Sequence, residues 1–209
     1  MKAKTIVVGA LVALFAMPAT AQTPPAKMAN VRGTIVKLDG QMLLVRGRDG
    51  KPVHVMLAPN FGVLAVQPLK LDDIKEGEFI GTAASPAKNG KLYAEEVLVF
   101  PEAARGTGEG HYGWDLKGKN DTMTNATITQ IEVAGVHKTG KDRVLMLKSK
   151  DGENEVIVRP GTPIVTFAPD SKDLLKHGAH VFIRASVADD GTISAARVVV
   201  GKNGVNPPM

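Results

Sequence analysis

Residues 59–99 read PNFGVLAVQPLKLDDIKEGEFIGTAASPAKNGKLYAEEVLV, and residues 160–200 read PGTPIVTFAPDSKDLLKHGAHVFIRASVADDGTISAARVVV. The second stretch matches the first at one fixed offset and without gaps. A match of this length indicates that the chain holds two copies of one small β unit. The identical residues include Pro59/Pro160, Pro68/Pro169, Asp72/Asp173, Lys75/Lys176, Gly77/Gly178, Ala84/Ala185, Ser85/Ser186, Gly90/Gly191, Val97/Val198 and Val99/Val200.

Each copy predicts the same order of elements: three strands, a short helical turn and two further strands. Asp-Gly and Asn-Gly pairs, such as Asp39-Gly40 and Asn89-Gly90, are typical of the tight turns that join antiparallel strands. The helical turns fall at 72–75 and 173–176. The strands are expected at 31–37, 41–46, 52–57, 78–84 and 91–100 in the first copy, and at 126–133, 143–148, 155–159, 180–185 and 192–200 in the second.

This order predicts an all-β fold, a tandem repeat of two small five-stranded OB-fold-like barrels with short helical turns. The OB-fold is a small Greek-key barrel of five strands. An SH3-like barrel is the alternative, and the helical turn between the third and fourth strands favours the OB type. Closing the sheet into a barrel also protects the edge strands of so small a unit.

The chain divides into segments of different character. Lys2 and Lys4 precede the apolar stretch 6–17, and Ala19-Thr20-Ala21 supplies small residues of the kind that a signal peptidase cleaves. The protein is therefore expected in the periplasm, with no membrane-spanning segment once the signal is removed. The expected segments are a signal peptide at 1–21, a disordered leader at 22–29, an OB-like repeat at 30–100, a glycine-rich linker or recognition segment at 101–124, a second repeat at 125–202 and a tail at 203–209.

The composition excludes several classes of chemistry. The chain has no cysteine, which excludes disulfides and thiolate catalysis. The formal charge of +5 falls to +3 if Lys2 and Lys4 are removed with the signal peptide. Only 4% of the residues are aromatic and the lysines are scattered, whereas nucleic-acid binding uses a basic stripe with stacking aromatics. We expect no nucleic-acid partner.

Two phrases resemble known exported proteins. Residues 71–79 (LDDIKEGEF) and 173–181 (DLLKHGAHV) resemble the D-L-K-x-G-D-x-V signature of bacterial OB-like domains. Residues 100–111 (FPEAARGTGEGH) and 114–116 (WDL) are similar to the central RGTGEGH-x-x-WDL motif of an uncharacterised proteobacterial periplasmic family with tandem OB-like domains. Some of its members are labelled metal transporter permeases. The resemblance implies the compartment and the architecture, and it assigns no chemistry.

The segment between the repeats has no counterpart elsewhere in the chain. Residues 105–114 read RGTGEGHYGW and hold the only tryptophan. One interpretation is a recognition loop, in which aromatic contact area is combined with directional polar groups. The other is a plug, in which Trp114 fills the groove between the two units. The predicted ligand-binding residues are Arg105, Glu109, His111, Tyr112, Trp114 and Asp115.

Metal binding and catalysis find little support in the sequence. His111, Glu109 and Asp115 form the alternative metal site, because they are the best cluster of nitrogen and oxygen ligands. No Gly-x-Ser-x-Gly elbow and no His-Glu-x-x-His motif occurs, so no catalytic residues and no enzyme activity are predicted. No cofactor is expected.

These patterns predict a non-catalytic exported binding or accessory module. It would recognise its partner through the central glycine-rich segment and the groove between the barrels. The candidate partners are an envelope protein, a glycan or peptide, or a small ligand. One alternative is a periplasmic metal-binding protein, and another is a structural or envelope-stress protein without a defined ligand.

Overall fold

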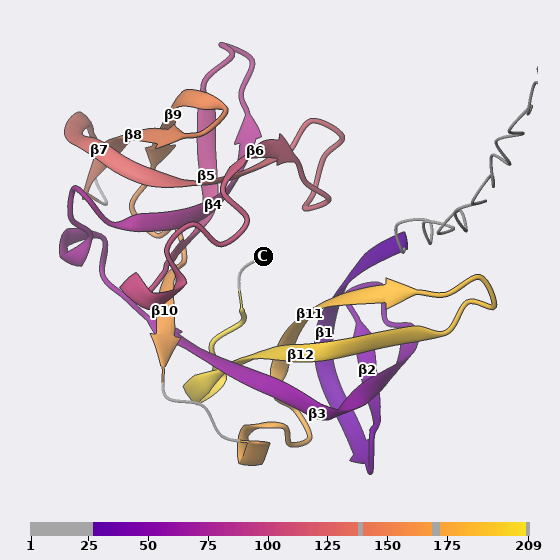
Figure 1. Cartoon of the computed structure of the whole chain (residues 1–209). Coiled ribbons are helices and arrows are strands. Elements are labelled where there is room, and N and C mark those ends of the chain that lie inside the picture. Colours follow the sequence, from indigo (N-terminus) through magenta and orange to yellow (C-terminus); the bar gives the residue numbers. More distant parts are fainter. Residues whose placement is uncertain (1–26, 138–139, 169–171, 208–209) are drawn as a thin grey trace, which may run out of the picture.

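The computed structural model describes residues 27–137, 140–168 and 172–207. The expected signal peptide at 1–21 and the leader up to residue 26 lie outside the described residues. Strands alternate with short 3-10 turns along the chain (Figure 1). The elements are β1 (Lys27–Asp39), β2 (Met42–Gly47), β3 (Pro52–Pro68), η1 (Leu71–Asp73), β4 (Phe79–Pro86), β5 (Leu92–Val99), η2 (Glu102–Ala104), β6 (Gly110–Gly113), β7 (Thr122–His137), β8 (Gly140–Ser149), β9 (Gly152–Val158), β10 (Ile164–Ala168), η3 (Lys172–Leu174), β11 (His180–Val187), β12 (Ile193–Gly201) and η4 (Lys202–Gly204).

The all-β prediction is confirmed, and every predicted strand is present. The two predicted helical turns are η1 and η3, each a single 3-10 turn. Three features lie beyond the predicted pattern: β3 continues as far as Pro68, and both β6 and β10 are additional strands. The continuation of β3 decides the topology, because an extended chain carries its end away from the strands that precede it.

Two closed rings of strands result from the pairing. The first barrel is the ring β1–β2–β3–β12–β11, closed by β11 on β1 and by the parallel pair β12 and β3. The second barrel is the ring β7–β8–β9–β5–β4, closed by β4 on β7 and by the parallel pair β5 and β9. Each barrel therefore contains five strands in the same cyclic order.

The barrels do not coincide with the sequence repeats. Segments 30–100 and 125–202, expected as two separate units, each contribute strands to both barrels. The N-terminal strands β1–β3 close with the C-terminal strands β11 and β12, and β7–β9 close with β4 and β5. Figure 1 shows the exchange as indigo and yellow strands in one barrel and magenta and orange strands in the other. The arrangement is a strand exchange within one chain, comparable to domain swapping between protomers.

Equivalent hydrogen bonds record the exchange in both barrels. The Ile35 N–H donates to the Ala179 carbonyl at 2.8 Å, and the Ile128 N–H donates to the Glu78 carbonyl at 2.9 Å. In the other direction, Gly178 N–H donates to Ile35 and Gly77 N–H donates to Ile128. Gly77 and Gly178 have φ of +86° and +82°, a conformation that other residues rarely adopt, which explains why glycine occupies both positions.

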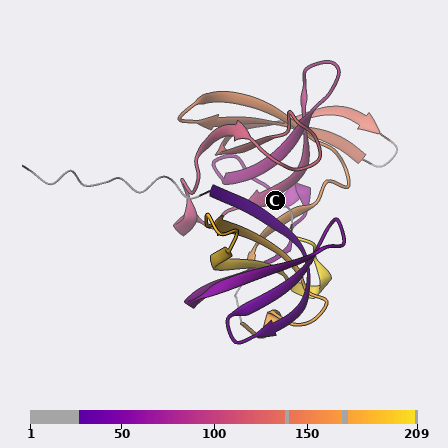
Figure 2. The same ribbon diagram turned by 90° about the vertical axis from the view of Figure 1, so that its right-hand side faces the viewer.

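An approximate twofold axis relates the two halves. Strand β3 pairs antiparallel with β10, and Val66 lies opposite Phe167, its own counterpart in the repeat. On either side, β12 runs parallel to β3 and β5 runs parallel to β10. The two barrels lie on opposite sides of this central pairing, one above the other in Figure 2.

Three hydrophobic clusters hold the structure together. One fills the first barrel around Ile35, Leu43 and Ile183, and one fills the second around Ile80, Leu145 and Leu147. The third lies between the barrels and contains buried residues from both, including Leu98 and Phe182. The barrels are therefore joined by a packed apolar contact as well as by the chain.

Several expected boundaries shift. Lys27–Ala29, expected in the disordered leader, begin β1 and pair with β11. Thr122–Thr124, expected in the linker, begin β7. In the expected tail at 203–209, Val205 packs against the cluster between the barrels, because η4 turns the chain back after β12. None of the helices in the described residues is long or apolar enough to cross a membrane.

Candidate functional site

The candidate site lies between the barrels, on the outer faces of two matching hairpins. Side chains alternate across a strand, so Val97 and Val198 face the barrel interiors while Glu96 and Arg197 face outward. The same alternation turns Ile183 inward and Phe182 outward. Hairpin β4–β5 of the second barrel therefore faces hairpin β11–β12 of the first.

A cavity of about 490 Å³ opens between these hairpins. This volume lies within the range of pockets that hold small molecules. Its walls are mostly apolar and carry five aromatic side chains. The lining residues are Met28, Leu64, Gly81, Glu96, Leu98, Phe100, Thr107, Gly108, Tyr112, Trp114, Met123, Asn125, Phe167, Phe182, Arg184, Arg197 and Val199.

The two sides of the cavity carry different side chains at matching positions of the repeat. Phe182 of β11 corresponds to Gly81 of β4, and Arg197 of β12 corresponds to Glu96 of β5. A β-carbon on Gly81 would lie 2.5 Å from Oδ1 of Asn125 and 3.1 Å from the Phe100 ring. Glycine therefore lets Asn125 and Phe100 pack directly against β4 on this side.

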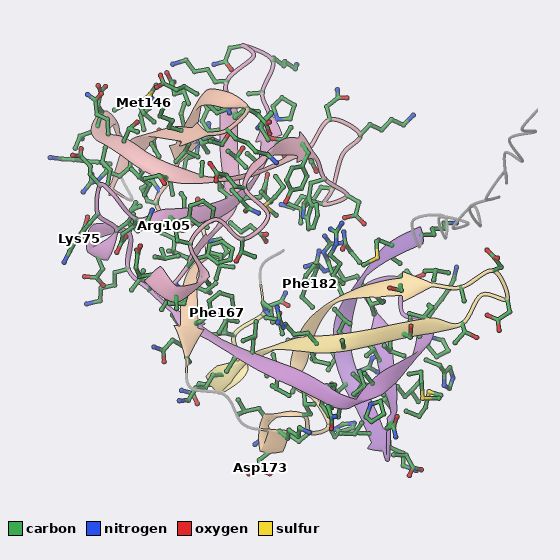
Figure 3. All side chains as sticks on the ribbon, in the orientation of Figure 1. Lys75, Arg105, Met146, Phe167, Asp173 and Phe182 are labelled. Carbon is green, nitrogen blue, oxygen red and sulfur yellow. The ribbon has the colours of Figure 1, made fainter. Side chains whose placement is uncertain are left out.

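The central segment contributes the aromatic side chains Tyr112 and Trp114. Strand β6 pairs with the start of β7, which places Tyr112 opposite Met123. The Trp114 ring lies 6.2 Å from that of Tyr112 and 6.4 Å from that of Phe182, measured between centroids. Trp114 thus extends from the second barrel to a side chain of the first. Phe167 and Phe182 both lie in the region between the barrels (Figure 3).

Two arginines lie close to the Trp114 ring. The Arg32 and Arg184 guanidinium carbons each lie 5.7 Å from the Trp114 centroid, within cation–π range. Asp115, next in the chain, accepts hydrogen bonds from Arg32 at 3.1 Å and from the Asn30 amide at 2.6 Å. Asp115 therefore anchors the central segment to β1 of the first barrel.

The charges along the cavity are not balanced. Arg32 is paired with Asp115. Burial and the Arg32 cation lower the pKa of Arg48, and the buried Glu96 acts in the opposite direction. Arg184 and Arg197 are exposed on the cavity wall and form no ion pair within the described part of the chain. The cavity therefore has an excess of positive charge.

The environment shifts the pKa of two groups of the central segment. Burial raises the pKa of the Tyr112 phenol, and the nearby Arg184 cation lowers it by less. Burial alone would raise the pKa of Asp115, but its hydrogen bonds to Arg32 and Asn30 lower it below the ordinary value of an aspartate. At neutral pH Tyr112 is a neutral hydrogen-bonding group and Asp115 is charged.

Arg105, a predicted ligand contact, fastens the segment to the second barrel instead. Its guanidinium donates to the Glu102 carboxylate at 2.6 Å and 2.7 Å. The same group donates to the Gly77 carbonyl at 2.8 Å and to the Thr127 hydroxyl at 3.2 Å. Figure 3 shows Arg105 on the second barrel, and it does not line the cavity.

Glu109 and His111 also hold the central segment on the second barrel. The Glu109 carboxylate accepts from the Lys150 N–H, and the Asp151 carboxylate accepts from the His111 N–H, both at 3.0 Å. These two hydrogen bonds connect the central segment to the turn between β8 and β9. A β-carbon on Gly110 would lie 2.5 Å from the Asp151 carboxylate, so the glycine is required by close packing.

The alternative metal site does not assemble. His111 Nδ1 lies 2.8 Å from the Thr124 hydroxyl, whereas Glu109 contacts Lys150 and Asp115 contacts Arg32. Within the residues that the structure describes, no group of three or more His, Cys, Asp or Glu side chains is placed to hold a metal ion. Two other hollows, of about 510 Å³ and 410 Å³, contain none of the predicted site residues.

Trp114 combines the two roles that the sequence left open. It packs against the cluster between the barrels and is half-buried, as expected of a plug. It also lines the cavity, as expected of a recognition residue. Its indole Nε1 is buried and has no hydrogen-bond partner in the described structure.

Several cavity residues were not among the predicted contacts, namely Glu96, Phe100, Phe167, Phe182, Arg184 and Arg197. A signal for most of them exists within the repeat. The pairs Gly81/Phe182, Ala83/Arg184 and Glu96/Arg197 differ strongly in size or charge, although they share one backbone position. Equivalent positions of the two repeats that carry side chains of different size or charge are candidates for function. The segment that is not copied is a candidate for the same reason, since the shared fold does not require its residues.

Comparison of the chain with protein-family models, with curated proteins and with solved structures finds no match.

Proposed function

We propose that this protein is a non-catalytic binding module that holds a small ligand in the cavity between its two barrels. The observation that carries the proposal is the mostly apolar cavity of about 490 Å³, lined by Trp114 and Tyr112 from the one segment that the repeat does not copy. Small-ligand sites are typically concave, largely apolar and furnished with a few polar groups.

The roles within the central segment divide between fastening and contact. Arg105, Glu109 and His111 hold the segment on the second barrel, and Asp115 holds it on the first. Tyr112 and Trp114 then present their rings to the ligand. Because both ends of the segment are tied, the contact residues are pre-organised, which lowers the entropy lost on binding.

We further propose that both barrels are of the OB type. Each ring has the cyclic order first–second–third–fifth–fourth strand, and the third and fifth strands run parallel. A 3-10 turn precedes the fourth strand in each case. Export to the periplasm and membership of the periplasmic family with the RGTGEGH-x-x-WDL motif belong to the same proposal, on the strength of residues 1–21 and 105–116.

The test is a comparison of native and denatured mass spectra of the untagged full-length chain, recovered from the cells that produce it. We expect additional mass in the native spectrum that is lost on denaturation. Trp114→Ala should lose this mass with a cost of about 1–2 kcal/mol in the free energy of unfolding, since the ring is only half-buried. Lys88→Gln, in the exposed turn between β4 and β5, serves as the control and should retain the ligand.

Two results would contradict the proposal. A native spectrum of the bare chain from several growth conditions would indicate an empty cavity and favour a structural role. Loss of more than about 3 kcal/mol in Trp114→Ala, with the bound mass retained, would make Trp114 a plug alone.

A further inference from the structure

We infer that the cavity between the barrels selects a small aromatic molecule that carries one negatively charged group, such as an aryl carboxylate or sulfonate. This inference rests on the proposed small-ligand function and specifies the chemistry of the ligand. It draws on two independent features of the cavity: its aromatic walls and its arginines without an ion-pair partner in the described structure.

The shape of the walls favours a flat apolar body. Rings approach the cavity from four parts of the chain: Phe100 after β5, Tyr112 and Trp114 in the central segment, Phe167 on β10 and Phe182 on β11. Neighbouring rings meet at tilted or edge-to-face angles, including 68° between Tyr112 and Trp114 and 42° between Trp114 and Phe182. Walls of this kind offer a flat guest both ring faces and ring edges.

The charges favour an anion. Asp115 offsets Arg32, and Glu96 is the one acidic side chain among the described residues of the cavity lining, against Arg184 and Arg197. Arg184 and Arg197, on adjacent strands of the first barrel, have no ion-pair partner in the described structure. Arginine presents a planar fork of donors that matches a carboxylate or sulfonate. A cationic guest would meet this excess of positive charge.

The tryptophan ring joins the two features. The Arg184 guanidinium carbon lies 5.7 Å from the Trp114 centroid, and both residues line the cavity. An acid group held by Arg184 would therefore lie close to the indole ring. An aromatic body and one acid group satisfy both features together.

The test uses 2-naphthoate and, as its matched opposite, 2-naphthylmethylammonium, which share one apolar body and differ in charge. Binding to the full chain is measured by titration calorimetry. Because the chain has one tryptophan, its indole N–H gives a single side-chain resonance that reports on the cavity directly. We expect 2-naphthoate to bind at least about tenfold more tightly than the cation and to move this resonance, since charge-assisted hydrogen bonds favour the anion.

Single substitutions test which arginines make the cavity prefer an anion over a cation. Arg184→Gln and Arg197→Gln should each weaken 2-naphthoate binding by about tenfold while leaving the cation unaffected or slightly improved. Lys88→Gln removes the same charge from the exposed β4–β5 turn and should change neither affinity. Both arginines are exposed, so these variants are expected to fold, and the unchanged core resonances of each variant verify it.

The outcomes separate this inference from the proposed function. Equal or tighter binding of the cation would overturn the anion selectivity, while a cavity that binds the naphthyl body would still support small-ligand binding. If neither probe binds and the indole resonance does not move, the aromatic-anion inference is overturned; the native mass spectrum then decides separately whether the cavity holds a ligand of another class.

Discussion

The hairpins β4–β5 and β11–β12 are copies of one sequence, yet they present different surfaces to the cavity. Their inward residues match, as in the pair Val97 and Val198, and both are fully buried. Their outward residues differ, as in Gly81 against Phe182 and Glu96 against Arg197. The barrel interior requires the same apolar volume in both copies, whereas the outward face is free to diverge.

The difference shows how a symmetric fold acquires an asymmetric site. With Phe182 on one side and glycine on the other, the central segment can lie against β7, beside the second barrel, and extend Trp114 across the axis. A symmetric pair of phenylalanines would occupy the space that Asn125 and Phe100 fill at Gly81.

The largest expected effect comes from deleting residues 172–209, which include β11 and β12. Because these strands close the barrel of β1–β3, amide protection should be lost in Leu43–Leu57 and retained in Leu145–Val158. Hydrogen exchange with mass spectrometry measures both regions in one experiment. If each repeat closed its own barrel, the pattern of loss would be reversed.

Phe182→Ala should be the most destabilising single substitution on the outward faces. The ring is 6% exposed and belongs to the cluster between the barrels, so its removal leaves a void costing about 3 kcal/mol. Urea unfolding measures the loss. The control is Val133→Ala, at a valine that is 58% exposed, for which the change should be within about 0.5 kcal/mol. A similar small change in Phe182→Ala would mean that the barrels do not depend on their shared cluster.

Gly81→Ala should cost about 2 kcal/mol, although it adds a single methyl group. The new carbon would lie 2.5 Å from the Asn125 side chain, which must then move away from its contacts with Gly108 and Tyr112. Gly62→Ala is the control, since nothing lies within 4 Å of its added carbon. Thermal unfolding compares the two, and equal midpoints would refute the proposed close packing at Gly81.

Asp121 makes stability depend on acid pH. Burial alone would raise the pKa of this carboxyl, but hydrogen bonds from the Gly118 and Lys117 N–H groups and from the Ser85 hydroxyl lower it below the ordinary value. A lowered folded-state pKa contributes stability that is present above the unfolded pKa, about 4, and is lost as the pH falls through the folded pKa.

The test of this pH dependence is Asp121→Asn. We expect a loss of about 1.5 kcal/mol at pH 7 and a smaller difference from the parent chain at pH 3, because the parent has then lost part of its charge. Urea unfolding at pH 7, 5 and 3 provides the comparison. A difference that does not change with pH would show that the charge of Asp121 is unimportant.

Arg105→Ala should have the smallest effect, with no measurable change in the urea midpoint of unfolding. Its pair with Glu102 is exposed and its remaining bonds are replaced by water. Ligand binding should weaken only slightly, since Arg105 does not line the cavity and Glu109 and His111 still hold the segment. A clear loss of the ligand mass, with normal stability, would return Arg105 to the contact residues.

Much of the fold could be predicted from the residues alone. The alternation of apolar and polar residues in stretches such as 53–57, together with the glycines of the turns, predicted the strands. The repeat predicted two barrels of five strands. The strand exchange could not be predicted, because an internal core valine fits either barrel equally well. Only the continuation of β3 to Pro68 and its pairing with β12 show which barrel each hairpin completes.

The candidate site was predicted in part. Tyr112 and Trp114 follow from their position in the segment that is not copied, and both line the cavity. Arg105, Glu109 and His111 lie in the same segment but point to the barrel beneath it. The register of β6 on β7 decides which side chains of this segment face the cavity. That register is set by the strand pairing and cannot be derived from the order of the residues alone.

The sequence by itself determined the all-β class, the duplicated unit and the turns that join its strands, because these depend on local alternation and on backbone conformations that only certain residues adopt. The tertiary structure alone decided the exchange of hairpins, the cavity between the barrels and the meeting of Trp114 with Phe182, Arg32 and Arg184. Those contacts join residues from distant parts of the chain, and their partners are chosen by the packing of whole strands rather than by any local pattern.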